Sequence, residues 1–313
     1  MSARAWRRLT VGAFGGLIFC LAACKPEAPA KIAGSPEAVP DQEADPAQQV
    51  EAAPDAGSPP AADTAEDPSD SGAEPTNAEP EPEEPEAPAI PEEPYRVLMI
   101  GDSLIATGIG ALLEKKLDAH PHVVAYRKGK SSSGLARCDF YDWIDQAKRQ
   151  VEFRKPDLTI VILGGNDGQD LTRPSGGGRR VTWKSEDWPG AYRERVDAFL
   201  AELTGEDRSV LWIGLPYMGL GSLEKKLILI RGVQKEAVEA LGDRGVYLDS
   251  LPFVTTEDGK MLQTAKVGPR NKTQSLRAED KIHFTMAGSE YFADHVYPTV
   301  LEVLALPDVQ PEP

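Results

Sequence analysis

The chain has 313 residues and a formal net charge of −16 at pH 7, because 50 acidic residues outnumber 34 lysines and arginines. Its three cysteines stand at positions 20, 24 and 138, which excludes a disulfide-rich scaffold and a zinc site built on CxxC pairs. The acidic excess lies in residues 25–94, with 19 acidic residues against two lysines, so that residues 95–313 come to only −2. A nearly neutral domain gives no electrostatic basis for binding nucleic acid.

Residues 1–23 have the pattern of a secretory signal peptide. Arg4, Arg7 and Arg8 precede an apolar stretch that is short and rich in glycine, which suits a signal better than a membrane span. The stretch ends Leu-Ala-Ala-Cys and resembles a bacterial lipobox, in which the cysteine becomes the first mature residue and carries lipid. This resemblance predicts lipidation at Cys24 and a lipid-anchored place in the cell envelope, at the bacterial outer membrane or the periplasmic face. An ordinary cleaved signal followed by an incidental cysteine is the alternative.

Residues 24–94 form a low-complexity segment that holds 16 of the 27 prolines and almost no aromatic or large aliphatic side chains. Such a segment buries too little apolar surface to offset its ordering entropy, so we expect disorder. Proline and charge repulsion extend it, and at about 3.1 Å per residue its length reaches at most about 220 Å. We interpret the segment as a tether; an acidic tail that binds a basic partner is the alternative.

Residues 95–305 are expected to form one folded domain, followed by a disordered tail at 306–313. Continuous apolar runs suit parallel strands that are covered on both faces. The expected strands are 95–101, 122–127, 158–165, 209–216 and 245–250, and the expected helices are 104–119, 139–153, 189–203, 222–241 and 286–303. Their alternation predicts a doubly wound α/β fold whose ligands bind beyond the carboxyl ends of the strands.

Three short stretches follow predicted strands. Ser103, in Gly-Asp-Ser-Leu, comes directly after the first strand, at its carboxyl end. Gly134, in Ser-Ser-Ser-Gly-Leu, follows the second strand and allows its N–H to approach a ligand closely. Asn166, in Gly-Gly-Asn-Asp, ends the third strand, and its side-chain amide is an uncharged donor suited to an oxyanion. Each stretch taken alone is also typical of an ordinary turn.

A nucleophilic serine needs a base, and the base needs an orienting group. His283 lies near the C-terminus with Asp280 three residues before it, so their side chains can meet on a turn. The other histidines of the domain fit less well. His120 and His122 flank a proline at a helix end opposite the expected catalytic edge, and His295 lies in the middle of a helix.

The four stretches, in this order, resemble the sequence blocks of SGNH hydrolases, also called the GDSL family: Ser, Gly, Asn, and His with Asp three residues before it. Stretches 131–143 and 185–196 further resemble a bacterial branch of that family catalogued only as a domain of unknown function. The resemblance spans nearly all of 95–305. It implies a flavodoxin-like three-layer α/β/α domain with a five-stranded parallel sheet, and hydrolysis of carboxylic esters, often acetyl or acyl groups on sugars or lipids.

The chemistry of these residue types agrees with the resemblance. Ser103 attacks the ester carbonyl, His283 accepts the serine proton, and Asp280 fixes the imidazole tautomer. The N–H groups of Ser103 and Gly134 and the side chain of Asn166 are expected to bind the oxyanion. Hydrolysis of a carboxylic ester, with no cofactor, is the predicted reaction.

Asp102 and Asp167 are interpreted as structural carboxylates that stabilise turns. A metallo-hydrolase that uses both of them with Asp280 and His283 is an alternative, although the chain has few histidines and lacks HExxH or paired-His spacing. We expect no metal. Two further alternatives remain: an acyltransferase using the same triad, and a tethered glycan-binding protein without activity.

The expected partner is an acylated glycan or a small ester, bound by a monomer that the Cys24 lipid holds at the membrane. The long tether and the nearly neutral domain favour an extended envelope polymer, most simply a polysaccharide with O-acetyl esters. Aromatic residues that either stack on sugars or fill the core are Trp143, Trp183, Trp188, Tyr141 and Tyr217. Of the tryptophans, Trp143 and Trp212 are expected in the core.

Overall fold

The structure is a computed structural model, and it describes residues 92–173 and 179–309. The predicted signal peptide, Cys24 and the tether up to residue 91 lie outside the described residues. In the described part of the chain, no helix has the length and apolar character needed to cross a membrane.

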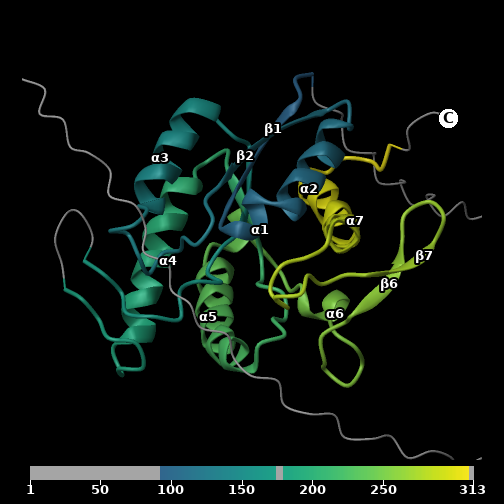
Figure 1. Cartoon of the computed structure of the whole chain (residues 1–313). Coiled ribbons are helices and arrows are strands. Elements are labelled where there is room, and N and C mark those ends of the chain that lie inside the picture. The colour runs from purple at the N-terminus through teal and green to yellow at the C-terminus, as the bar shows by residue number, and fades with distance from the viewer. Residues whose placement is uncertain (1–91, 174–178, 310–313) are drawn as a thin grey trace, which may run out of the picture. The chain divides into compact units, whose positions relative to one another are not determined.

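One sheet of five parallel strands, in the order β2-β1-β3-β4-β5, forms the centre of the domain (Figure 1). The strands are β1 (Tyr95–Gly101), β2 (Val123–Gly129), β3 (Leu158–Ile162), β4 (Ser209–Ile213) and β5 (Gly245–Leu248). In register, Val97 of β1 lies between Ala125 of β2 and Leu158 of β3. This order is flavodoxin-like, with the change of direction between β1 and β3. The predicted α/β/α fold with a five-stranded parallel sheet is therefore confirmed.

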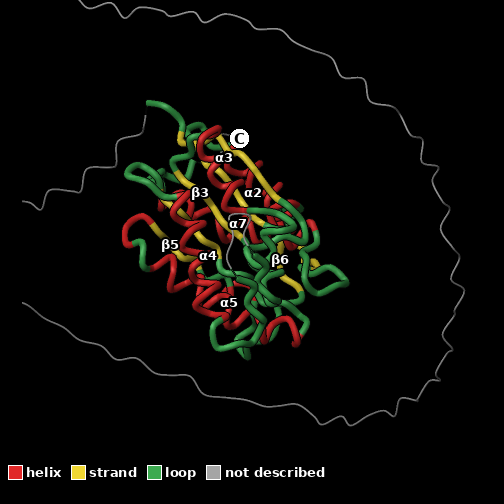
Figure 2. The backbone as a smooth tube through the Cα atoms, turned by 90° about the vertical axis from the view of Figure 1, so that its left-hand side faces the viewer, coloured by secondary structure: helices red, strands yellow, loops and turns green. Residues whose placement is uncertain are grey.

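Helices cover both faces of the sheet, so that the strands run between them in the side view (Figure 2). The helices are α1 (Ser103–Ala106), α2 (Gly108–Asp118), α3 (Trp143–Arg154), α4 (Trp188–Leu203), α5 (Gly221–Glu239), the 3₁₀ turn η1 (Gly242–Arg244), α6 (Leu251–Val254) and α7 (Met286–Val303). Helix α2 packs on α7, whereas α4 packs on both α3 and α5 (Figure 1). Two separate helical layers result.

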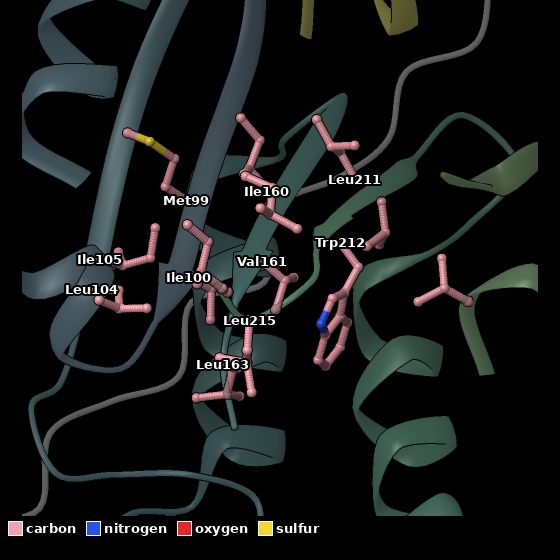
Figure 3. Packing of buried hydrophobic residues seen from close by; sticks show 14 of the residues in the cluster. Met99, Ile100, Leu104, Ile105, Ile160, Val161, Leu163, Leu211, Trp212 and Leu215 are labelled. Atoms are coloured by element: carbon pink, nitrogen blue, oxygen red, sulfur yellow. The ribbon is translucent and has the colours of Figure 1, made fainter. Parts of the chain in front are cut away.

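The core is built from the apolar runs that predicted the strands. All five residues of β3 are buried, as are the last five of β1, because helices cover both faces of the sheet. Figure 3 shows side chains of both strands, among them Ile100 and Val161, packed with other buried apolar residues. Trp143 and Trp212 are buried, as expected. Trp188 is buried too, stacked on Tyr192 with ring centroids 4.8 Å apart, so it offers no face to a sugar.

The prediction of one continuous helix over 104–119 is wrong, because the chain forms two helices, α1 and α2, with a break at Thr107. Thr107 between them has a non-helical backbone, with φ −113° and ψ −144°, and its hydroxyl donates to the Ser103 carbonyl at 2.6 Å. Gly108 then lies against α7, where a Cβ would come within 2.4 Å of Ser289 Oγ. The close packing of α7 thus accompanies the break, and Ser103 begins a helix of a single turn.

A two-stranded antiparallel hairpin between α6 and α7 was not expected from the sequence. It consists of β6 (Thr264–Val267) and β7 (Lys272–Ser275). All four residues of β7 are exposed, so no apolar alternation marks them as a strand.

Both ends of the described domain lie at the amino edge of the sheet. The N–H of Tyr95 donates to the His122 carbonyl at 2.9 Å, just before β2 begins. His120 Nε2 lies 3.1 Å from the carbonyl oxygen of Pro307, and Leu306 is buried. Residues 306 and 307 therefore pack with the domain rather than belonging to the predicted tail.

Candidate active site

A cavity of about 610 Å³ opens at the carboxyl edge of the sheet, where the fold predicts a ligand. Ser103, Asn166 and His283 line it together. They come from three separate places: the end of β1, the loop after β3 and the loop before α7. The fold thus brings together three of the predicted site residues, which are up to 180 positions apart in the chain.

A hydrogen-bonded chain joins Ser103, His283 and Asp280. His283 Nε2 lies 2.7 Å from Ser103 Oγ, and His283 Nδ1 lies 2.6 Å from Asp280 Oδ2. An ionised carboxylate only accepts hydrogen bonds, so Nδ1 carries the ring proton and Nε2 is left as the acceptor for the serine hydroxyl. This arrangement is the one in which a histidine removes a proton from a serine.

The other oxygen of Asp280 is held by the turn itself. Oδ1 accepts the main-chain N–H groups of Ile282 and His283, both at 2.9 Å. Burial raises the pKa of Asp280, but hydrogen bonds from the His283 ring and from these two N–H groups outweigh it and lower the pKa to about 2. The carboxylate is therefore ionised throughout the neutral range.

Asn166 points its amide toward the loop after β2. Its Nδ2 donates to the Ser133 carbonyl at 2.9 Å, which uses one of the two amide hydrogens and leaves the other for a ligand. Ser131 and Ser132 of the same loop line the cavity. Asn166 is thus held in place while keeping one donor available.

Gly134, in the same loop as Ser131 and Ser132, is buried and does not line the cavity. A Cβ at this position would lie 2.0 Å from Asp167 Oδ1, so the backbone here approaches a carboxylate more closely than any other residue type allows. The expected role of the Gly134 N–H in binding an oxyanion stays a prediction.

Two buried carboxylates tie the loops of the site to one another. Asp102 accepts the N–H of Leu104 through Oδ1 and that of Gly165 through Oδ2, each at 3.1 Å, and so links the first and third sequence stretches. Burial raises the pKa of Asp102 to about 6, against the opposing effect of these hydrogen bonds. Asp102 has the turn-stabilising contacts that the sequence analysis assigned to it.

Asp167 is the second buried carboxylate, and it holds the sequence stretch around Gly134. It accepts the N–H groups of Leu135 at 3.1 Å and Ala136 at 2.8 Å, and the hydroxyl of Tyr192 at 2.8 Å. Burial raises the pKa of Asp167. A turn-supporting role was predicted for Asp167, whereas its hydrogen bond from Tyr192 of α4 was not.

Arg277 is a residue of the site that sequence reasoning missed. It is buried, and its guanidinium donates to the Ile282 carbonyl at 3.1 Å and to the Tyr217 carbonyl at 2.7 Å. It also lies 3.7 Å from the centroid of the Phe284 ring. Arg277 thereby joins the loop that carries His283 to the loop after β4. No local pattern identifies it, because an arginine in a polar stretch is usually exposed.

The loop after β4 has a second buried support. Arg231 and Glu224 of α5 form an ion pair at 2.5 Å, Arg231 Nε donates to the Leu215 carbonyl at 2.7 Å, and Glu224 accepts the Met218 N–H at 2.8 Å. Met218 is part of the cavity wall. The pair therefore fixes one side of the cavity.

The rest of the lining includes Asp102, Thr107 and two glycines, and none of it is tryptophan or tyrosine within the described residues. Its apolar side chains are Leu104, Met218, Leu223, Ile282, Phe284 and Met286. In residues 92–173 and 179–309, no group of three histidine, cysteine, aspartate or glutamate side chains is arranged to hold a metal ion.

Solved structures similar to this chain include three described hydrolases. A catalytic mutant of an acetylxylan esterase from Geobacillus stearothermophilus has 17% identity and a TM-score of 0.49, covering 72% of this chain and 100% of that one. An α/β hydrolase from the metagenome of Lake Arreo, Spain, has 15% identity and a TM-score of 0.47, covering 69% and 98%. A candidate GDSL-like lipase from Bacteroides ovatus has 13% identity and a TM-score of 0.46, covering 69% of this chain and 55% of that one. No curated protein matches the chain.

One family model matches the chain over residues 96–299, and it is described as "Protein of unknown function (DUF459)". The match begins in β1 and ends in α7, so it includes the loops that carry Ser103, Asn166 and His283. It agrees with the predicted membership of a branch known only as a domain of unknown function. The chain therefore belongs to the DUF459 family of proteins of unknown function.

Proposed function

We propose that this protein is a serine esterase that hydrolyses carboxylic esters. One observation carries the proposal: the continuous hydrogen bonding from Ser103 Oγ through His283 to Asp280, at 2.7 and 2.6 Å, beside a cavity of about 610 Å³. Nucleophile, base and orienting carboxylate are thus in contact, and the nucleophile adjoins space for a substrate.

In the first half of the reaction, Ser103 Oγ attacks the ester carbonyl carbon while its proton passes to His283 Nε2. Asp280 stabilises the imidazolium that forms. The carbonyl oxygen becomes an oxyanion, which the Asn166 amide and the Ser103 N–H bind, with the Gly134 N–H as the predicted third donor. The bond to the alcohol oxygen then breaks, and that oxygen takes the proton from Nε2. An acyl-enzyme and a free alcohol result.

In the second half, a water molecule attacks the acyl carbon and gives a proton to His283 Nε2. The bond from the acyl carbon to Ser103 Oγ breaks, and the proton returns to Oγ. The acid leaves. Asp280 stays ionised throughout, consistent with its lowered pKa of about 2.

We further propose that the substrate is an acylated polysaccharide of the cell envelope, most simply one with O-acetyl esters. Support comes from the sequence: the lipobox-like start, Cys24 and the long tether, all outside the described residues, suit an enzyme that works on a fixed polymer. The apolar wall formed by Met218, Leu223 and Phe284 provides a contact for the acyl group.

The test of the esterase proposal is Ser103→Ala, assayed with p-nitrophenyl acetate. Loss of the nucleophile should lower kcat by about a thousandfold or more, because the triad acts as a unit. The melting temperature should move by no more than about 2 °C, since His283 is the one hydrogen-bond partner of this hydroxyl within the described residues. Ser222→Ala, at an exposed position of α5, is the matched control.

Near wild-type activity in Ser103→Ala would overturn the mechanism. Acetate release from an O-acetylated glycan, measured with and without added alcohol, distinguishes hydrolysis from acyl transfer: a transferase would move the acetyl group to the alcohol and release little acid.

A further inference from the structure

A second hollow, of about 850 Å³, lies beside the catalytic cavity. Three segments of the chain contribute to both. The loop after β2 lines the cavity with residues 131 and 132 and the hollow with residues 137 and 139. The loop after β3 lines the cavity with residues 165 and 166 and the hollow from residue 168 onward. Helix α5 contributes to each in the same way.

The contribution of α5 shows how close the two spaces are. Leu223 lines the cavity and Lys226 lines the hollow, and three residues along a helix correspond to a rise of about 4.5 Å. Lys226 Nζ also donates to the Gly168 carbonyl at 2.7 Å, two residues from Asn166. The linings of the two spaces are therefore adjacent both along α5 and along the loop after β3.

The hollow carries a local excess of positive charge. Arg137 pairs with Asp139 at 2.8 Å and Arg180 pairs with Asp170 at 2.5 Å, all four being lining residues. The lining holds two further cations, and they are Arg173 and Lys226. Because residues 95–313 come to −2 overall, this concentration of cations departs from the rest of the domain.

An aromatic ring completes the lining. Trp183 is half-buried, and Lys226 Nζ lies 5.7 Å from the centroid of its ring. An indole face beside a cation suits a sugar ring that carries a carboxylate, because the apolar face of the sugar packs on the ring while its acid group meets the charge.

We propose that this hollow is a subsite for an acidic sugar unit, a uronate, next to the esterified unit of the substrate. The inference rests on the proposed esterase function and narrows its substrate class to acylated acidic polysaccharides. Recognition combines the excess charge of Arg173 and Lys226 with the ring of Trp183.

The kinetic test compares two acetylated tetramers that differ only at C6, β-1,4-tetraglucuronate and cellotetraose. The wild-type kcat/KM should be at least tenfold higher for the acidic tetramer, and raising the salt to 0.5 M should reduce that ratio, since an exposed charge is screened. In Lys226→Gln the ratio should fall at least threefold, because Arg173 still supplies a positive charge. Lys225→Ala is the matched control, because its side chain is exposed on the same helix and lines neither space; it should keep the wild-type ratio.

Lys226 also supports the Gly168 carbonyl, so a second variant is needed. Arg137→Gln removes a lining cation whose side chain, among the described residues, bonds only to Asp139, and it should lower the ratio at least threefold. Arg137→Gln with Asp139→Asn restores the net charge of the lining and should recover most of the ratio. Equal kcat/KM values for the two wild-type tetramers, or a ratio unchanged in Lys226→Gln and Arg137→Gln, would overturn the subsite.

A binding measurement separates this proposal from the esterase proposal. Calorimetric titration of Ser103→Ala with unacetylated tetraglucuronate should give a Kd at least tenfold lower than titration with cellotetraose. Such binding by a protein whose wild type hydrolyses no ester would retain the subsite and reject the esterase. Ester hydrolysis by the wild type, with no selective binding of tetraglucuronate, would retain the esterase and reject the subsite.

Discussion

Asp102 is a carboxylate enclosed by the fold, with two main-chain N–H groups as its hydrogen-bond donors and no cation beside it among the described residues. Burial disfavours its charged form, and the pKa rises from 3.8 to about 6. The folded protein thus holds this proton more tightly than the unfolded chain does. Burial of Asp102 therefore costs no stability below about pH 4, where the carboxyl is protonated in both states. The folded protein loses stability relative to the unfolded chain as the pH rises from there through 6.

The raised pKa of Asp102 predicts how the stability of the protein changes with pH. Between pH 4 and pH 7 the free energy of unfolding of the wild type should fall relative to Asp102→Asn by about 3 kcal/mol, the equivalent of the shift. The variant does not titrate at this position. Urea unfolding at pH 4, 5, 6 and 7 measures the difference, and parallel pH profiles for the two proteins would show that burial does not perturb Asp102.

Asp280 represents the opposite case, a carboxylate whose charge is stabilised. Asp280→Asn should lower kcat for p-nitrophenyl acetate by about a thousandfold or more, because an amide in its place no longer fixes the His283 tautomer. The side chain is 47% exposed, so the melting temperature should change little. Asp258→Asn, on an exposed loop, is the control. A variant with more than a tenth of wild-type kcat would remove Asp280 from the mechanism.

Whether a site residue could be predicted from the sequence depends on how far along the chain its contacts lie. Asp280 and His283 are three positions apart and Ser103 adjoins an apolar strand, so local sequence identifies them. Arg277 bonds to a carbonyl 60 positions away, and Tyr192 reaches Asp167 across 25 positions. Those partners exist only after the chain has folded, and neither side chain belongs to a recognisable stretch.

At the scale of elements, the loop before α7 acts as a small scaffold. Arg277 and Phe284 form an isolated antiparallel bridge, and the Ala278 N–H donates to the His283 carbonyl at 2.9 Å. The Arg277 guanidinium donates to the Ile282 carbonyl within the loop and to the Tyr217 carbonyl of the loop after β4. Burial lowers the pKa of Arg277 to about 10, so it remains charged at neutral pH.

Arg277→Lys should therefore uncouple the loop before α7 from the loop after β4, since an ammonium cannot replace the two-pronged guanidinium at the carbonyls of Ile282 and Tyr217. We expect kcat to fall about tenfold with KM within about twofold, because misplacing a base affects the transition state more than binding. Arg149→Lys, at an exposed position of α3, serves as the control. An equal rise in KM with unchanged kcat would assign Arg277 to substrate binding instead.

The same scale shows why most elements, but not all, follow from the sequence. Strands β1 and β3 are buried on both faces, so their apolar runs are continuous, and α7 was predicted with its observed ends. The break at Thr107 depends on packing between α2 and α7, which no local pattern contains. In the hairpin, all side chains of β7 are exposed, and β6 is only four residues long with Val267 as its one buried residue, so neither strand has an apolar run long enough to predict it.

For the whole molecule, the anchor at Cys24 is the proposal to test. Cys24→Ser should abolish lipid labelling and move the protein from the membrane fraction to the soluble fraction, because lipid chains supply the membrane affinity. Its kcat for p-nitrophenyl acetate should equal that of the wild type, since the described site draws only on residues beyond 92. Continued membrane association would indicate an uncleaved span or a protein partner.

The position of the two ends of the domain has a practical consequence. Tyr95 and Pro307 both reach the short segment between α2 and β2, at the edge of the sheet opposite the catalytic cavity. Strand β1 alone separates the two edges by about 23 Å, at about 3.3 Å for each of its seven residues. The domain therefore suits grafting: a linker that joins its ends, or a host loop that receives them both, would leave the reactive edge turned outward, and new termini could be opened elsewhere.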